Sequence, residues 1–153
     1  MTHPAQSAPR PADTTLATLR RDGHQLSSLK QEMRANLLAA LAAGEDPWSG
    51  LHGFQDTVIP QVERAVLAGH DIVLLGERGQ GKTRLLRTMV GLLDEWSPVI
   101  SGSELGEHPY QPVTPASIRR AAELGDELPV TWRHRSQRYA EAAPCCALTR
   151  WLR

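Results

Sequence analysis

An eight-residue run in the middle of the chain constrains this protein most. Residues 76–83 read GERGQGKT and fit the pattern G-x-x-x-x-G-K-[ST] at every fixed position. Glycines at such positions let the backbone curl until successive amides point inward at an anion, which a Cβ atom would obstruct. The run therefore predicts a loop that holds the phosphates of a nucleotide. Its predicted nucleotide-binding residues are Gly76, Glu77, Arg78, Gly79, Gln80, Gly81, Lys82 and Thr83.

Two side chains of this run have separate expected roles. Lys82 supplies a mobile cation for the β- and γ-phosphates, and Thr83 supplies a hydroxyl for Mg²⁺. The helix expected after them directs its positive end at the same charge. The predicted ligands are therefore ATP and Mg²⁺, with Thr83 as the metal-binding residue. The chain has only two lysines, Lys30 and Lys82, and one of them stands at the motif position.

The sequence on either side of the run predicts its structural setting. Residues 71–75 (DIVLL) form a short, unalternating apolar run, which is typical of a strand covered on both faces at the centre of a parallel sheet. Residues 82–96 carry apolar side chains with a helical period and predict an amphipathic helix packed on that sheet. Strand, glycine loop and helix in this order predict an α/β fold of the P-loop NTPase class.

Further elements follow from caps and breakers. Ser28 and Gln31 form a capping-box pattern that predicts a helix ending at Gly44. A second helix is expected from a cap at Asp56 or Thr57, with Pro60 in its first turn and Gly69 at its end. The elements expected further along are a short strand at residues 99–100, a helix from Thr114 to Gly125 and a weak strand at residues 130–132.

Composition and charge exclude several classes of protein. The chain has 17 Lys+Arg and 17 Asp+Glu, so no net field draws it to nucleic acid or to an anionic membrane. Its longest aliphatic run, residues 72–75, is far shorter than the roughly 20 residues that span a bilayer. The start of the chain does not resemble a secretory signal, so a cytoplasmic location is expected. Cys145 and Cys146 fit neither a zinc spacing nor a disulfide framework.

The expected organisation has three parts. Residues 1–15 are rich in Pro, Ala, Ser and Thr and predict a flexible tail. Residues 16–141 are expected to form the P-loop domain. Residues 142–153 contain both cysteines and no acidic residue, and this shift in composition predicts a tail outside the domain.

Other candidate residues are weaker. Asp94 follows an apolar run, but twelve residues along the predicted helix it lies about 18 Å from the phosphates and cannot reach the metal. The histidines at positions 52, 70 and 108 share no metal-ligand spacing and are given no role. A basic cluster could contact a phosphate or a partner, although a solvated face is favoured; it contains Arg133, His134, Arg135 and Arg138.

Residues 48–96, together with the segment RHRSQRYAE at 133–141, resemble the start of the AAA+ ATPase module of magnesium chelatase subunit I and its close bacterial relatives. The resemblance covers about residues 17–141, and the turn at 53–56 is similar to the segment that lies over the adenine in that family. It implies assembly into rings, commonly hexamers, with homo- or hetero-oligomeric AAA+ subunits as partners. It also implies that ATP hydrolysis drives a partner, which in the chelatase inserts Mg²⁺ into protoporphyrin.

The chain departs from that family after residue 141. In the family the module continues with the acidic Walker B strand, the sensor residues, the arginine finger and a helical lid, and the 153 residues contain none of these. The prediction is an incomplete front part of the module, preceded by N-terminal helices and produced by truncation or a frameshift, which binds ATP without hydrolysing it alone. The alternatives are an interaction module completed in trans by another chain, and a small P-loop kinase.

Overall fold

The computed structural model describes residues 8–77 and 79–138. The chain divides into two compact units. Unit 1 comprises Met1–Leu26 and Glu95–Gln137, and unit 2 comprises Ser27–Asp94 and Arg138–Arg153. The predicted domain bounds at residues 16 and 141 stay a prediction, and the predicted tail at 142–153 lies outside the described residues.

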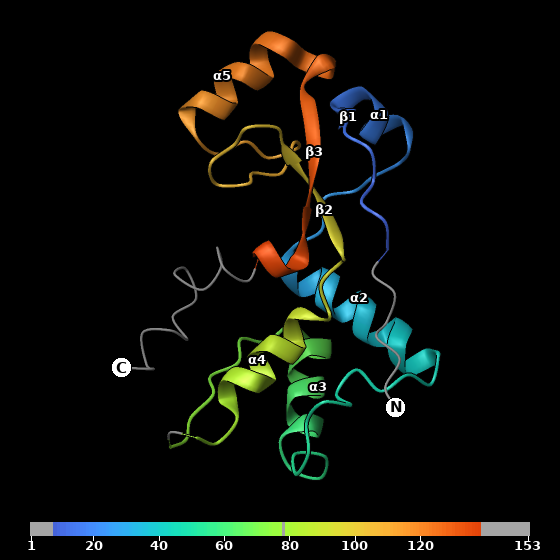
Figure 1. The fold of residues 1–153 in the computed structure, drawn as a ribbon, viewed down its shortest axis with the longest axis vertical. Coiled ribbons are helices and arrows are strands. Elements are labelled where there is room, and N and C mark those ends of the chain that lie inside the picture. Colours follow the sequence, from blue (N-terminus) through green and yellow to red (C-terminus); the bar gives the residue numbers. More distant parts are fainter. Residues whose placement is uncertain (1–7, 78, 139–153) are drawn as a thin grey trace. The chain divides into compact units, whose positions relative to one another are not determined.

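Unit 1 contains a three-stranded sheet in the order β1-β3-β2 (Figure 1). Its strands are β1 (Thr14–Thr15), β2 (Trp96–Ile100) and β3 (Pro129–His134). Both neighbouring pairs are antiparallel, with Ile100 opposite Val130 in the β2–β3 pair. The predicted strands at 99–100 and 130–132 are confirmed, and both extend further. The predicted parallel sheet is wrong for the described residues, because these strands belong to an antiparallel sheet.

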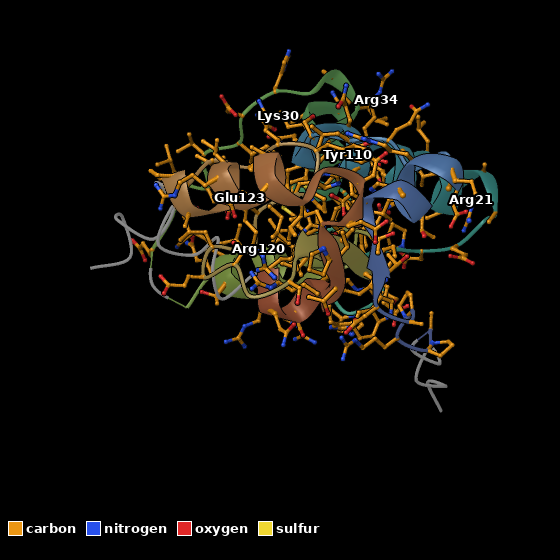
Figure 2. The ribbon with its side chains drawn as sticks, turned by 90° about the horizontal axis from the view of Figure 1, so that it is seen from above. Arg21, Lys30, Arg34, Tyr110, Arg120 and Glu123 are labelled. Atoms are coloured by element: carbon orange, nitrogen blue, oxygen red, sulfur yellow. The ribbon has the colours of Figure 1, made fainter. Side chains whose placement is uncertain are left out.

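The helices of unit 1 are α1 (Leu16–Arg21) and α5 (Pro115–Leu124), with a short 3-10 helix at Gly125–Glu127. The Thr114 side chain accepts a hydrogen bond from the Ser117 amide, so the predicted start of α5 is confirmed. Arg120 on α5, which Figure 2 labels, donates a hydrogen bond to the Ser101 carbonyl. One core cluster of the unit contains Leu16, Ile100 and Leu128, with Tyr110 and Ala121 packed against it.

Part of the segment predicted as a flexible tail lies against the sheet. Thr14 and Thr15 form β1, and the Ala12 carbonyl accepts a hydrogen bond from Trp132 Nε1 at 2.9 Å. The Ala8 carbonyl accepts one from Trp96 Nε1 at 3.0 Å. Within residues 8–15, the backbone is therefore tied to β2 and β3 by partners more than eighty positions away in sequence.

A buried carboxylate organises the loop of unit 1 that precedes α5. Glu107 Oε1 accepts hydrogen bonds from the amides of Val113, at 3.0 Å, and Thr114. Its Oε2 accepts from the hydroxyls of Ser103, at 3.0 Å, of Thr114, at 3.2 Å, and of Ser117. Burial raises the pKa of Glu107, but the Ser117 hydroxyl, the Thr114 amide, the Ser103 hydroxyl and the Val113 amide together lower it from 4.5 to about 2. The carboxylate is therefore held in its charged form.

Unit 2 consists of the helices α2 (Leu29–Ala42), α3 (Ile59–Ala68) and α4 (Lys82–Val90) (Figure 1). The predicted capping box of α2 is confirmed, since Ser28 and Gln31 make both of its hydrogen bonds. The predicted cap of α3 at Asp56 or Thr57 is wrong, because its N-cap is Val58, which has no side-chain bond; Gly69 ends the helix as predicted. The buried core contains Leu37, Trp48, Leu51, Ile59, Val62, Val66, Leu85 and Leu92.

The last helix of unit 2 is shorter than the sequence predicts. It ends at Val90 rather than at Trp96, which belongs to β2. The backbone leaves the helix because Leu92 and Leu93 turn inward to buried positions. The Asp94 amide then donates to Glu32 Oε1 at 2.6 Å. Contacts with α2 therefore outweigh the helical period of the apolar residues in this segment.

No helix in the part of the chain that the structure describes is both long enough and apolar enough to span a bilayer.

Candidate phosphate-binding loop

The segment before the loop does not form the predicted strand. Residues 71–77 have no regular secondary structure, and Figure 1 shows no arrow between α3 and α4. Ile72 and Leu74 pack against the core of unit 2, whereas Val73 and Leu75 are 70% and 83% exposed. This alternation is that of an extended chain covered on one side. The predicted cover on both faces is absent here because, among the described residues, no strand pairs with the segment.

The start of this segment is tied to α2 by the first of the two lysines. Lys30 Nζ lies 2.7 Å from Asp71 Oδ1, and Figure 2 labels the Lys30 side chain. The hydrogen bond and the charge of Lys30 lower the pKa of Asp71 below its ordinary value. Both groups are exposed, so the pair contributes little to stability.

The glycine run forms an irregular loop that leads directly into α4, so the predicted order of loop and helix is confirmed. Gly81 is the N-cap of α4 and has φ 74°, a conformation that favours glycine. A Cβ atom on Gly81 would lie 2.9 Å from Cζ of Phe54, so the aromatic ring of the turn at 53–56 contacts the end of the loop. Arg78, a predicted binding residue, lies outside the described residues.

Three groups of the loop meet on one face of Gly76. The Glu77 amide donates a hydrogen bond to Gln80 Oε1 at 3.0 Å. Lys82 Nζ donates to the Gly76 carbonyl at 2.7 Å and to the Glu77 carbonyl. A Cβ atom on Gly76 would lie 2.1 Å from Gln80 Oε1 and 3.6 Å from Lys82 Nζ. The Glu77 amide, the Lys82 ammonium group and the side-chain oxygen of Gln80 therefore lie close together, in a space that a side chain at position 76 would fill.

This arrangement suits an oxyanion. Backbone amides and a lysine at the start of a helix are the donors that hold phosphate oxygens in glycine-rich loops. The Glu77 amide is one such donor, and in this structure it donates to the side-chain carbonyl oxygen of Gln80. Thr83 is exposed in the first turn of α4, where its hydroxyl is available to a metal bound with a phosphate. The residues thus fit the phosphates of ATP with Mg²⁺.

The other predicted residues lie elsewhere. Asp94 is not in α4, so the spacing used to place it far from the loop does not apply; its Oδ1 accepts from Asn36 Nδ2 at 2.8 Å. His52 and His70 are exposed. His108 stacks on His24, with 3.1 Å between their Nε2 atoms. In residues 8–77 and 79–138, no group of three or more His, Cys, Asp or Glu side chains is placed to hold a metal ion.

The basic cluster is engaged within the protein. Arg138 forms a bidentate pair with the buried Glu32, with Nη2 and Oε2 2.9 Å apart. His134 Nε2 lies 3.7 Å from a carboxylate oxygen of Glu95. The favoured solvated face is therefore wrong for Arg138, whose partner is buried. The sequence analysis did not identify Glu32 as a buried partner. The local pattern shows only an acidic residue in the first turn of α2, next to Met33, which packs on the core.

The loop and the helix after it have the glycine-rich sequence and the order of elements that are typical of P-loop proteins. Comparisons with known proteins agree at that level. The ABC transporter patM of Penicillium expansum is 33% identical over 98 residues, which are 62% of this chain and 6% of that protein. The hemin import ATP-binding protein HmuV of Nocardia farcinica is 38% identical over 63 residues, which are 41% of this chain and 21% of that protein. These similarities indicate a P-loop ATPase-like region.

The comparisons also mark where the similarity stops. The chain spans 6% and 21% of the lengths of these two curated relatives. No family model matches the chain, and no solved structure matches it. Neither relative is named as a magnesium chelatase subunit, so these similarities do not support that narrower resemblance.

Proposed function

We propose that this chain is an ATP-binding module that holds the phosphates of the nucleotide in the loop at residues 76–83. The observation that carries the proposal is the convergence of the Glu77 amide and the Lys82 ammonium group on one face of Gly76, where the amide already binds an oxygen of Gln80. The similarity to a protein named as an ATP-binding protein supports the choice of nucleotide.

Each residue of the loop has a distinct part in the proposed complex. Lys82 pairs with the terminal phosphates, and the backbone amides of the loop donate to their oxygens. Thr83 offers its hydroxyl to Mg²⁺, which neutralises phosphate charge when it is bound. Phe54, which contacts the end of the loop, offers an aromatic surface next to the nucleotide. This agrees with the place that the family resemblance gives to the turn at 53–56.

Binding is proposed without hydrolysis by the isolated chain. Phosphoryl transfer to water needs an acidic group that helps to place Mg²⁺ and the attacking water. The sequence assigns no residue of this chain to the acidic strand that supplies this group in the resembling family. We therefore expect ATP to bind and to leave unchanged. An interaction module completed by another chain would show this same property.

The test uses the two lysines of the chain as a matched pair. Lys82→Ala removes a charge-assisted contact with phosphate, which is worth about 1.5 to 3 kcal/mol, so we expect ATP affinity measured by calorimetry to fall about 10- to 150-fold. Lys30→Ala removes the same charge from the same unit but breaks only the exposed pair with Asp71, and its ATP affinity should match that of the wild type. Equal affinity in wild type and Lys82→Ala would overturn the proposal.

The narrower hypothesis is a magnesium chelatase-type AAA+ subunit. It rests on the resemblance of residues 48–96 and on the contact of Phe54 with Gly81, which brings the turn at 53–56 to the loop. It predicts that ATP promotes assembly of the chain with itself or with other AAA+ subunits. Sedimentation with and without ATP tests this, and a monomer under both conditions, alone and with a chelatase-type subunit, counts against it.

A further inference from the structure

We propose that Gln80 is an internal competitor of the phosphate, which keeps the loop closed on itself and must swing away when a nucleotide binds. This inference rests on the proposed function and adds a residue that limits affinity at the same site. Gln80 stands at a variable position of the motif, where the pattern requires no particular side chain.

The first observation is the hydrogen bond from the Glu77 amide to Gln80 Oε1, at 3.0 Å. An amide has a single N–H group, so this donor cannot fully serve the Gln80 oxygen and a phosphate oxygen together. Residue 77 follows Gly76, and the amides of such a loop are the expected phosphate donors. Gln80 therefore occupies a donor that the nucleotide needs.

The second observation is where the Gln80 oxygen lies. A Cβ atom built on Gly76 would lie 2.1 Å from Gln80 Oε1, and that Cβ position is 3.6 Å from Lys82 Nζ. The Gln80 carboxamide thus occupies the space that a Cβ atom on Gly76 would fill, and Lys82 Nζ lies next to the same space. A phosphate oxygen that reaches both Lys82 and the Glu77 amide has to enter the same space.

The third observation is that Lys82 is also engaged inside the loop. Its Nζ donates hydrogen bonds to the carbonyls of Gly76 and Glu77. Glu77 is also the residue whose amide donates to Gln80. These acceptors are neutral, whereas a phosphate is charged and makes the stronger hydrogen bonds. The nucleotide therefore displaces the internal contacts, and its affinity is reduced by the free energy of releasing them. Gln80 acts through the loop and is a positioning residue.

Three substitutions separate this role from a purely structural one. Gln80→Ala removes the competing oxygen, so ATP should bind about three- to tenfold more tightly, although the loop loses a hydrogen bond. Gln80→Glu places a carboxylate beside Lys82 and should weaken ATP binding at least tenfold. Gln61→Ala, which changes an exposed glutamine on α3, is the matched control and should leave affinity unchanged. Inorganic tripolyphosphate should show the same order of affinities, because the competition concerns phosphate alone.

The outcomes are distinguishable from those of the proposed function. If Gln80→Ala binds ATP no more tightly than the wild type, the role of Gln80 is overturned. If Lys82→Ala still weakens ATP binding in the same experiment, the proposed function stands. Hydrogen exchange of the Glu77 amide provides a readout that needs no nucleotide. Gln80→Ala should speed this exchange relative to the wild type and Gln61→Ala, and an unchanged rate overturns the inference.

Discussion

Glu107 in unit 1 and Gln80 in unit 2 both place a side-chain oxygen on a backbone amide, but under opposite conditions. The Glu107 oxygens are charged, buried and bonded to five donors. Gln80 Oε1 is neutral and exposed, and it accepts from the Glu77 amide. The charged, fully bonded Glu107 therefore stabilises its loop strongly, whereas the single exposed hydrogen bond of Gln80 costs little to break.

The largest expected effect comes from neutralising Glu107. Its pKa of about 2 lies below the ordinary value of 4.5, so its stabilising effect is complete above about pH 5 and is lost as the pH falls toward 2. We expect unit 1 to lose about 3 kcal/mol of stability over this range. Urea unfolding measures it when it is followed by the separate NMR signals of the indole N–H groups of Trp96 and Trp132, which belong to unit 1.

Two variants act as controls for this acid effect. Glu107→Gln leaves the amides of Val113 and Thr114 with a weaker acceptor, so it should be destabilised by about 2 to 3 kcal/mol at pH 7 and should respond much less to acid. Glu104→Gln changes an exposed neighbour and should behave as the wild type does. An acid transition of equal size in Glu107→Gln would assign it to other carboxylates.

A smaller effect is expected from the glycines of the loop. Gly79 has φ 84° with open space around it, and Gly81 has φ 74° with Phe54 against it. Alanine at either position forces a left-handed conformation, which costs about 1 to 2 kcal/mol. Gly81→Ala should cost more than Gly79→Ala, since only its Cβ meets an aromatic ring. If Gly79→Ala and Gly81→Ala lose equal free energy of unfolding, the Phe54 ring moves away from the new Cβ atom at no measurable cost.

The smallest effect is expected in the segment before the loop. Val73→Thr changes a side chain that is 70% exposed, and it should alter the free energy of unfolding by less than about 0.5 kcal/mol. Ile72→Thr, one position earlier, changes a side chain packed on the core of unit 2 and should cost about 1 to 2 kcal/mol. If thermal unfolding shows that Val73→Thr costs as much as about 1 to 2 kcal/mol, the value expected for Ile72→Thr, then residues 71–75 are covered on both faces, as a central strand would be.

Short-range patterns in the sequence predicted local structure well. The capping box needs only Ser28 and Gln31, three residues apart, and both of its hydrogen bonds are present. The cap of α5 at Thr114 is equally local. The start of α4 at Lys82 follows from the glycine motif. The predicted binding residues of the loop stay a prediction, although Gly76, Glu77, Gln80 and Lys82 do lie together.

Predictions that depended on distant partners were less successful. The apolar period continues to Trp96, yet α4 ends at Val90, because Glu32 and Asn36 of α2 bind the backbone that follows. The run at 71–75 has the composition of a central strand, but a strand requires a neighbour to pair with. β1 was missed because two threonines carry no periodic signal of their own and pair with β3 more than a hundred residues later.

The start of α4 and the caps of α2 and α5 could be read from the sequence alone, because each depends on groups within a few residues of one another. Only the tertiary structure decided the antiparallel sheet and the pairing of Arg138 with Glu32, whose partners lie 106 positions apart. It also decided that Gln80 turns into the loop, since the motif leaves that position free and the rotamer depends on the fold of the backbone around Gly76.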